Sequence, residues 1–401
     1  MPRQPELIVD TVLNLPLLLS RRGFHAVAIV SGGRSVRGRR EWPLLIDTML
    51  KENLRLVDFT LRGEPSPQTV DLFYRELQAE LPDCDAVVGI GGGSVLDCAK
   101  ALAAMAGMGR TAEVGSIKDF LEGVGTRQAT GETLPLFAVP TTAGTGSEAT
   151  KNAVLSEIGP GGYKRSIRHD AFIPRLALLD PALGISCPPE VTRASGLDAI
   201  TQLIEVYLSV DANPLSDTLA LEGLRQAGRS FPALIAGGDG AEHRLSMSLA
   251  AYVSGVGLAS AGLGLVHGIA SALGAAHSIP HGVICGLLLA PSIKIGLERA
   301  ADSAISQHDF SVIRQRYAHA AQALGLSGRD NSPGESADGE STDGAERLIE
   351  GIGRWADGLP RLGSFGLESD EISSIAEKSS RKKAPVQYTV KDICAALEDS
   401  L

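Results

Sequence analysis

Short apolar runs in the first half of the chain lead directly into glycine turns or helical patterns. The clearest run, 85–90, continues into the turn 91–94, and the run 26–30 is also followed by glycines. Uninterrupted apolar strands are typical of sheets buried on both faces, and strands that alternate with helices form parallel sheets. The first half therefore predicts a doubly wound, Rossmann-like α/β fold.

From about residue 185 onward, strand signals nearly vanish and long Ala- and Leu-rich segments dominate. We predict an α/β domain over residues 1–184 and an all-helical domain over 185–401. The segment 327–344 is polar, acidic and rich in glycine, a composition that cannot bury a core. We predict a mobile surface loop there. The helices predicted in the second half cover residues 191–209, 216–236, 242–259, 267–273 and 311–324.

Charge and cysteine content exclude several classes of protein. A net charge of −10 repels nucleic acid, so no nucleic-acid partner is expected. No run of about 18 apolar residues suggests a membrane span, and the first ten residues do not resemble a secretory signal. The five cysteines are widely spaced, without a CxxC pair, which predicts reduced thiols in the cytoplasm.

The turn after the run 85–90 is a candidate phosphate-binding site. Its residues Gly91, Gly92 and Gly93 precede a helical pattern. Glycines let backbone N–H groups approach a pyrophosphate, and the start of a helix contributes the positive end of its dipole. A purely structural turn is the alternative.

A second turn follows another apolar strand and is rich in hydroxyl groups. Hydroxyls and free backbone amides suit contacts with ribose and nicotinamide, although a capped helix start would have the same composition. The hydroxyl residues singled out here are Thr141, Thr142, Thr145 and Ser147.

The two segments GGGSVLDCAK and PTTAGTGSEAT resemble the two cofactor signatures of the iron-containing alcohol dehydrogenase family. The resemblance extends over nearly the whole chain and implies NAD or NADP as cofactor. It places Thr141, Thr142 and Ser147 near the adenine and the nicotinamide ribose. Lys164 falls where the family carries a lysine that contacts the cofactor. The residues that the resemblance places along the pyrophosphate are Gly92, Gly93, Ser94 and Asp97.

The family often has an aspartate after its first strand, where it would hold the adenosine ribose. This chain has glycine there, followed by Arg34, Arg37 and Arg39. Loss of a carboxylate and gain of guanidinium groups would favour the 2′-phosphate of NADP. A solvated basic loop explains the arginines equally well, so NAD and NADP both remain open.

The second half contains a candidate metal site. Asp198 and Gln202 are four residues apart in a helical pattern, which places them on one helix face. The resemblance implies one divalent ion, Fe2+ or Zn2+, bound by an aspartate, a histidine four residues later and two further histidines. Asp198, His267 and His281 match three of these positions. Gln202 stands at the fourth, and an amide oxygen is a poorer ligand than imidazole, so loose or absent metal is also open.

A second departure concerns proton transfer. The family commonly has a histidine near the substrate where this chain has Ser271. His277 could replace it as the catalytic proton shuttle, because an imidazole titrates near neutral pH. A polar residue that only lines the substrate site is the alternative.

The resemblance predicts a metal-dependent alcohol dehydrogenase or aldehyde reductase that transfers hydride between NAD(P) and a small alcohol or aldehyde. It implies that residues 1–184 bind the dinucleotide, that 185–401 bind metal and substrate, and that the protein forms a homodimer. A metal-independent reductase of keto acids, similar to maleylacetate reductases, is the first alternative. A non-catalytic cofactor-binding or assembly protein is the second.

Overall fold

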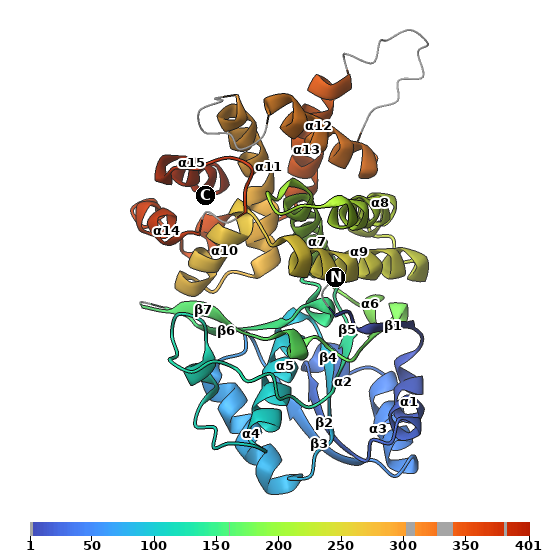
Figure 1. Cartoon of the computed structure of the whole chain (residues 1–401). Helices are drawn as coiled ribbons and strands as arrows, with labels where there is room; N and C mark the ends of the chain where they lie inside the picture. Colours follow the sequence, from blue (N-terminus) through green and yellow to red (C-terminus); the bar gives the residue numbers. More distant parts are fainter. Residues whose placement is uncertain (1–2, 160, 302–308, 327–339, 381–382) are drawn as a thin grey trace. The chain divides into compact units, whose positions relative to one another are not determined.

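The computed structural model describes residues 3–159, 161–301, 309–326, 340–380 and 383–401. Its contacts divide the chain into two units (Figure 1). Unit 1 comprises Met1–Glu157 and Gly162–Cys187, and unit 2 comprises Ile158–Gly161 and Pro188–Leu401.

Unit 1 is built on a six-stranded sheet in which every recorded strand pair is parallel. This confirms the predicted Rossmann-like fold. In spatial order the strands are β1 (Glu6–Val9), β8 (Leu176–Leu179), β5 (Leu136–Pro140), β4 (Ala86–Gly91), β2 (Ala26–Ser31) and β3 (Arg55–Thr60).

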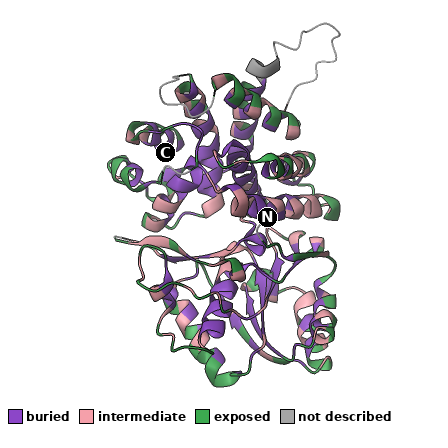
Figure 2. Cartoon of the chain, in the orientation of Figure 1, coloured by how far each residue is buried: buried purple, intermediate pink, exposed green. Residues whose placement is uncertain are grey.

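Helices cover both faces of this sheet. In β2, Ala28 and Val30 pack into the core beside α4 (Pro67–Glu80) and α5 (Gly93–Met108), whereas Ile29 faces the opposite core. That second core includes residues of two other helices, α1 (Leu15–Arg21) and α3 (Glu41–Lys51). All six residues of β2 and of β4 are buried (Figure 2), which is why these strands read as continuous apolar runs.

An antiparallel hairpin of β6 (Asn152–Glu157) and β7 (Tyr163–Arg168) completes the strands described in unit 1. Its alternating and partly polar residues did not predict strands at the sequence level. The remaining elements of unit 1 are η1 (Val12–Asn14), α2 (Arg34–Arg37), η2 (Ile117–Phe120), η3 (Ser147–Ala149), η4 (Asp170–Phe172) and α6 (Pro181–Gly184).

The secondary-structure elements described in unit 2 are all helices. Its centre is α7, where every residue from Gly196 to Leu208 is buried (Figure 2). Helices α8, α9, α11, α12 and α13 all pack against α7. The elements of unit 2 are α7 (Pro189–Leu208), α8 (Pro214–Ile235), α9 (Ala241–Ala261), α10 (Leu265–Ala276), α11 (His281–Ala300), α12 (Phe310–Ala323), α13 (Glu340–Ala356), η5 (Leu362–Phe365), α14 (Ile372–Lys378) and α15 (Val390–Ser400).

Capping residues account for several of the helix ends. Ser66 accepts a hydrogen bond from the backbone N–H of Thr69 at the start of α4. Asn213 and Ser216 form a reciprocal capping box at the start of α8. In both helices the first residue is proline, whose fixed φ suits that position and whose missing N–H costs nothing there.

Helix α11 was not predicted from the sequence. It contains Pro291 and glycines that break the helical pattern, yet it is a continuous helix of 20 residues packed against α7. The predicted loop 327–344 falls largely outside the described residues, and its C-terminal end is wrong because α13 already begins at Glu340.

Among the residues that the structure describes, no single helix is long and apolar enough to span a membrane. Taken together, α9 and α10 are long and apolar enough for a span by length and composition alone, but the pair is bent by 100°.

Candidate metal centre and cofactor turns

The two turns singled out in the sequence lie against each other in unit 1. The backbone N–H of Thr141 donates to the carbonyl of Gly91, at 3.0 Å. A Cβ on Gly93 would lie 2.5 Å from Thr145 Oγ1, and a Cβ on Gly92 would lie 3.1 Å from Thr142 Oγ1. The glycines therefore allow the second turn to approach the start of α5, at the carboxyl ends of β4 and β5, where dinucleotides bind in such sheets.

Asp97 joins these turns to the hairpin. Its Oδ1 accepts a hydrogen bond of 2.5 Å from Ser147 Oγ, and its Oδ2 accepts one of 3.1 Å from the backbone N–H of Val154. Both carboxylate oxygens are thus engaged by protein groups. The contacts of Asp97 are those of a residue that positions the second turn.

Lys100 holds the same turn through hydrogen bonds from its ammonium group. It was not predicted as part of the site. The side chain is 1 % exposed, and its Nζ donates to the carbonyls of Ser147 and Asn152 and to the Thr150 hydroxyl. Burial lowers the pKa of Lys100 to about 8, against the opposing effect of Asp97. Charge-assisted hydrogen bonds of this kind are strong and hold the turn in one conformation.

Ser94 and Lys164 also lie close together, linked by a residue that the sequence did not indicate. Ser94 Oγ donates to Glu64 Oε1 at 3.3 Å, and Lys164 Nζ lies 3.2 Å from Glu64 Oε2. A hydroxyl and an ammonium group therefore lie near the N-terminus of α5, where the helix dipole stabilises an anion and the carboxylate of Glu64 opposes one.

The arginines expected near a 2′-phosphate have protein partners. Arg37 donates to Ser31 Oγ at 2.9 Å and forms an ion pair of 2.6 Å with Asp58. Arg39 donates to the carbonyls that end α6, whereas Arg34 is exposed. The carboxylate of Asp58 beside Arg37 opposes the binding of the 2′-phosphate of NADP.

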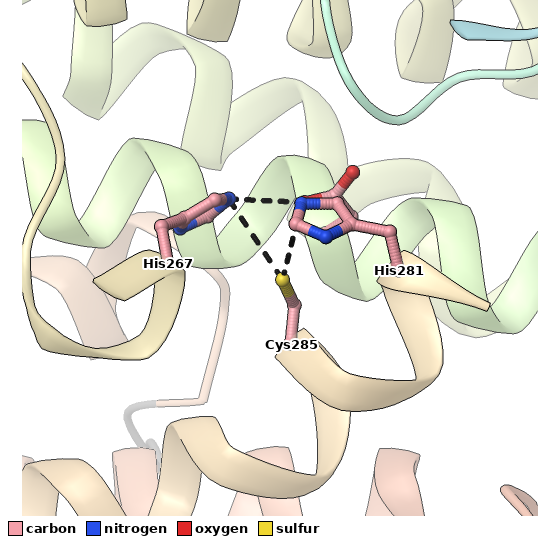
Figure 3. A group of neighbouring side chains, drawn as sticks. His267, His281 and Cys285 are labelled. Carbon is pink, nitrogen blue, oxygen red and sulfur yellow. Dashed lines mark hydrogen bonds and ion pairs between the residues drawn. The ribbon is translucent and has the colours of Figure 1, made fainter. Parts of the chain in front are cut away.

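In unit 2, three helices bring the predicted aspartate and histidines together. Asp198 Oδ1, from α7, lies 3.3 Å from Nε2 of His267, on α10, and 3.7 Å from Nε2 of His281, at the start of α11. Cys285 joins them: its Sγ is 3.8 Å from His267 Nε2 and 3.6 Å from His281 Nε2 (Figure 3). One donor atom from each of the four side chains lies within 4.8 Å of the others.

The glycine after each histidine has a packing role. A Cβ on Gly282 would overlap the carbonyl oxygen of Ala194 on α7, and a Cβ on Gly268 would overlap the carbonyl oxygen of Ser380. Only glycine permits these approaches. The His-Gly steps of the sequence therefore indicate that both histidines sit where backbones come very close.

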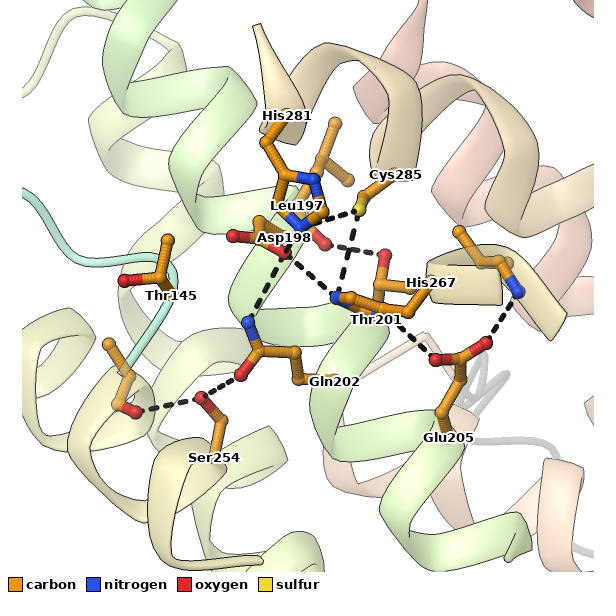
Figure 4. A network of polar contacts seen from close by, with 12 residues as sticks. Thr145, Leu197, Asp198, Thr201, Gln202, Glu205, Ser254, His267, His281 and Cys285 are labelled. Carbon is orange, nitrogen blue, oxygen red and sulfur yellow. Dashed lines mark hydrogen bonds and ion pairs between the residues drawn. The ribbon is translucent and has the colours of Figure 1, made fainter. Parts of the chain in front are cut away.

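Glu205, two turns beyond Asp198 on α7, orients His267 (Figure 4). Its Oε2 lies 2.7 Å from His267 Nδ1, and its Oε1 accepts from the backbone N–H of Val266 at 2.7 Å. An ionised carboxylate only accepts, so Nδ1 carries a hydrogen and Nε2 is directed toward Asp198. Carboxylate–histidine pairs of this type support metal-binding histidines.

Gln202 contacts the cluster through its amide group (Figure 4). Nε2 donates to Asp198 Oδ1 at 3.3 Å, and Oε1 accepts from Ser254 Oγ at 2.9 Å. In this arrangement the amide nitrogen is directed toward Asp198 and the amide oxygen toward α9.

The electrostatics of the cluster favour a cation. Burial raises the pKa of Asp198, but His281 and His267 outweigh that effect and lower it to about 2. Burial lowers the pKa of His267, yet Cys285, Glu205 and Asp198 together hold it well above 6.5. Burial raises the pKa of the Cys285 thiol to about 12. A buried set of carboxylate, imidazole and sulfur donors is the chemistry of sites for Zn2+ and similar ions.

His277 lies outside this group of four side chains. It is the C-cap of α10, and its Nε2 lies 3.3 Å from Glu371 Oε2. The structure therefore connects the predicted proton shuttle to a carboxylate that is 43 % exposed.

Cys285 and Glu205 are the two residues of the cluster that the sequence interpretation missed. Glu205 shares a helix face with Asp198 and Gln202, at the spacing i, i+4, i+7. Cys285 is four residues after His281 and would have been recognised if α11 had been predicted.

Comparison with known proteins gives a consistent result. The family model described as iron-containing alcohol dehydrogenase matches residues 7–181, and the model of the C-terminal part of that family matches residues 192–401. Long-chain-alcohol dehydrogenase 1 of Geobacillus thermodenitrificans is 34 % identical over 322 residues, covering 78 % of this chain and 74 % of that protein. NAD-dependent methanol dehydrogenase of Bacillus methanolicus is 31 % identical over 354 residues, covering 85 % and 83 %.

Solved structures agree along the whole chain. A 1,3-propanediol oxidoreductase superposes with a TM-score of 0.83 at 25 % identity, covering 100 % of this chain and 99 % of that one. The sulfoacetaldehyde reductase of Bifidobacterium kashiwanohense, solved in complex with NAD+, has the same fold with a TM-score of 0.80 at 24 % identity, covering 100 % and 97 %.

Proposed function

This chain belongs to the iron-containing alcohol dehydrogenase family, and on that premise we propose that its two units bind different reactants. The protein is an NAD(P)-dependent alcohol dehydrogenase that uses a divalent metal ion. Unit 1 is proposed to bind the dinucleotide. Unit 2 is proposed to bind the ion together with a small alcohol or aldehyde.

The observation that carries this proposal is the set of donor atoms on three helices of unit 2, in which Asp198, His267 and Cys285 are buried and His281 is partly exposed. Asp198 supplies a carboxylate oxygen, and His267 and His281 supply imidazole nitrogens directed toward it. When bound there, a divalent ion acts as a Lewis acid that lowers the pKa of an alcohol or polarises an aldehyde. Asp198 offsets part of the positive charge, and Glu205 holds His267 in the tautomer that can bind an ion.

In unit 1 the proposal assigns the pyrophosphate to the N-terminus of α5. Gly92 and Gly93 expose backbone N–H groups there, and Ser94 and Lys164 lie beside them. Asp97 and Lys100 hold the second turn, whose hydroxyl groups suit the riboses. When bound there, the cofactor would supply the hydride chemistry at C4 of its nicotinamide.

His277 is proposed to carry the proton that accompanies the hydride. Its partner Glu371 is partly exposed and offers a route to solvent. We also propose a cytoplasmic homodimer, supported by the family resemblance; none of the five cysteines forms a disulfide within the chain.

The experiment that tests this function is metal analysis of the purified protein, paired with NAD+ and NADP+ reduction on a panel of short alcohols. We expect about one divalent ion per chain, with activity lost on chelation and restored by metal. Activity that survives complete removal of metal would instead favour a metal-independent keto-acid reductase. A protein that binds no nicotinamide cofactor would favour the non-catalytic alternative.

A further inference from the structure

We propose that Cys285 is the fourth protein ligand of the metal ion and that Gln202 positions Asp198. This inference rests on the proposed metal-dependent function. It assigns Asp198, His267, His281 and Cys285 as the ligand set of this chain, and it selects Zn2+ or Co2+ over Fe2+ because a thiolate is a soft ligand.

Four of the distances between the donor atoms fit a divalent ion bound by all four side chains, which a substrate oxygen would join as a fifth ligand. Zn–N and Zn–O bonds of about 2.1 Å and a Zn–S bond of about 2.3 Å imply N···O edges of about 3.4 Å and N···S edges of about 3.6 Å. The structure has N···O separations of 3.3 and 3.7 Å, from Asp198 to the two imidazoles. It has N···S separations of 3.8 and 3.6 Å, from Cys285 to the same imidazoles.

The position of Cys285 is fixed by the helix that also supplies His281. The two residues are four apart at the start of α11, so both side chains lie on one helix face (Figure 3). The thiol is fully buried, and both sulfur contacts given above are to imidazole nitrogens that are themselves candidate ligands. An ion among these groups would displace the thiol proton to solvent, leaving a thiolate bound to it.

Gln202 has a different set of contacts. Its Nε2 donates to Asp198, and its Oε1 lies 2.9 Å from Ser254 Oγ, whose single hydrogen is shared with the carbonyl of Ala251 at 2.7 Å (Figure 4). The amide group thus holds the carboxylate of Asp198 in place through a hydrogen bond. The rival arrangement reverses the amide: Nε2 would donate to Ser254 Oγ, and the oxygen of Gln202 would become the ligand in place of sulfur.

Cobalt distinguishes the two arrangements, because thiolate bound to Co2+ gives an intense near-ultraviolet charge-transfer absorption that amide oxygen does not. We expect this absorption in the Co2+-loaded protein, in Gln202→Ala and in the control Cys187→Ser, whose thiol is in unit 1. We expect it to be absent from Cys285→Ser. A wild-type protein that binds Co2+ without this absorption, or a Cys285→Ser variant that retains it, would overturn the proposal.

Zinc X-ray absorption of the wild-type protein gives a second test that requires no variant. One sulfur neighbour at about 2.3 Å is expected. A shell of nitrogen and oxygen alone would refute the role of Cys285 while leaving the metal-dependent function intact. Failure to bind any divalent ion would refute both.

Discussion

The two candidate sites of this enzyme are built in different ways. The cofactor edge of unit 1 consists of the two turns 91–94 and 141–147, which follow the neighbouring strands β4 and β5. Asp97 and Lys100 hold the second turn through hydrogen bonds. The metal cluster of unit 2 consists of side chains on α7, α10 and α11. In the first site the protein shapes a surface for an extended ligand, and in the second it places four atoms around one point.

This difference determines how each site responds to substitution. A backbone turn is disturbed when a side chain fills the space that glycine leaves. A cluster of donor atoms is disturbed when one donor, or the group that orients it, is removed. The two sites lie in separate units of the fold, so we expect their defects to be separable.

Asp198→Asn tests this separation with the largest expected effect. Replacing the carboxylate removes the negative charge that an ion needs, so kcat should fall by about a thousandfold or more, equivalent to several kcal/mol of lost Lewis-acid stabilisation. Metal content should fall with it. The cofactor Kd, measured by nicotinamide fluorescence, should be unchanged, and a parallel loss of cofactor binding would break the proposed division between the units.

Glu205→Gln should have a smaller effect on the same site. Loss of the carboxylate that orients His267 should weaken metal affinity by about 10- to 100-fold. Competition with a chelator of known affinity measures this change. The control is Glu222→Gln, on the exposed face of α8, which should bind metal like the wild type. Equal affinities in both variants would show that His267 needs no support.

Glu148→Gln tests how a buried carboxyl group in η3, at the end of the second turn, makes the stability of the protein depend on pH. Burial raises the pKa of Glu148 from 4.5 to about 7, and one of its carboxylate oxygens is buried without a hydrogen-bond partner. Because the pKa of Glu148 is higher in the folded state than in the unfolded state, the contribution of this group to stability is fully present below pH 4.5. That contribution is lost as pH rises toward 7. The glutamine variant has no such loss, so its advantage in the free energy of unfolding should grow to about 3 kcal/mol by pH 8.

Thermal unfolding at several pH values measures that advantage. A difference in Tm between Glu148→Gln and the wild type that stays constant from pH 5 to pH 8 would contradict the assignment of Glu148 as the titrating group.

Gly93→Ala has the smallest expected effect. It alters the cofactor turn of unit 1 and should leave the metal cluster of unit 2 unchanged. Its Cβ would crowd Thr145 Oγ1, and the strain should weaken cofactor binding by about tenfold without altering metal content. Gly353→Ala is a matched control, since a Cβ there meets nothing within 4 Å. Cofactor titration compares the two, and a wild-type Kd in Gly93→Ala would show that the turns can separate without cost.

Much of the fold could be predicted because its periodicity is local. The strands β2 and β4 are buried on both faces and therefore read as uninterrupted apolar runs. Helix α7 carries Asp198 and Gln202 at the spacing expected for one face. Helix α11 escaped prediction because Pro291 and its glycines oppose helix formation, whereas packing against α7, α10, α13 and α15 favours the helix.

The metal cluster could be predicted only in part for the same reason. Asp198, His267 and His281 were expected from the resemblance to the family. Cys285 and Glu205 lie at helical spacings from His281 and Asp198, but such spacings give only a shared helix face, and a ligand or its support is defined by distances between helices. Those distances depend on close approaches such as that of Gly282 to Ala194, which no local pattern encodes.

The residues of each site also occupy separate stretches of the chain. Those of the cofactor edge lie between Glu64 and Lys164, and those of the metal cluster lie between Asp198 and Cys285. A genetic crossover between two relatives near residue 187 would therefore transmit each site whole. Such a crossover would join the cofactor site of one relative to the metal ligands of another, so a ligand set that contains Cys285 can be inherited independently of the choice between NAD and NADP.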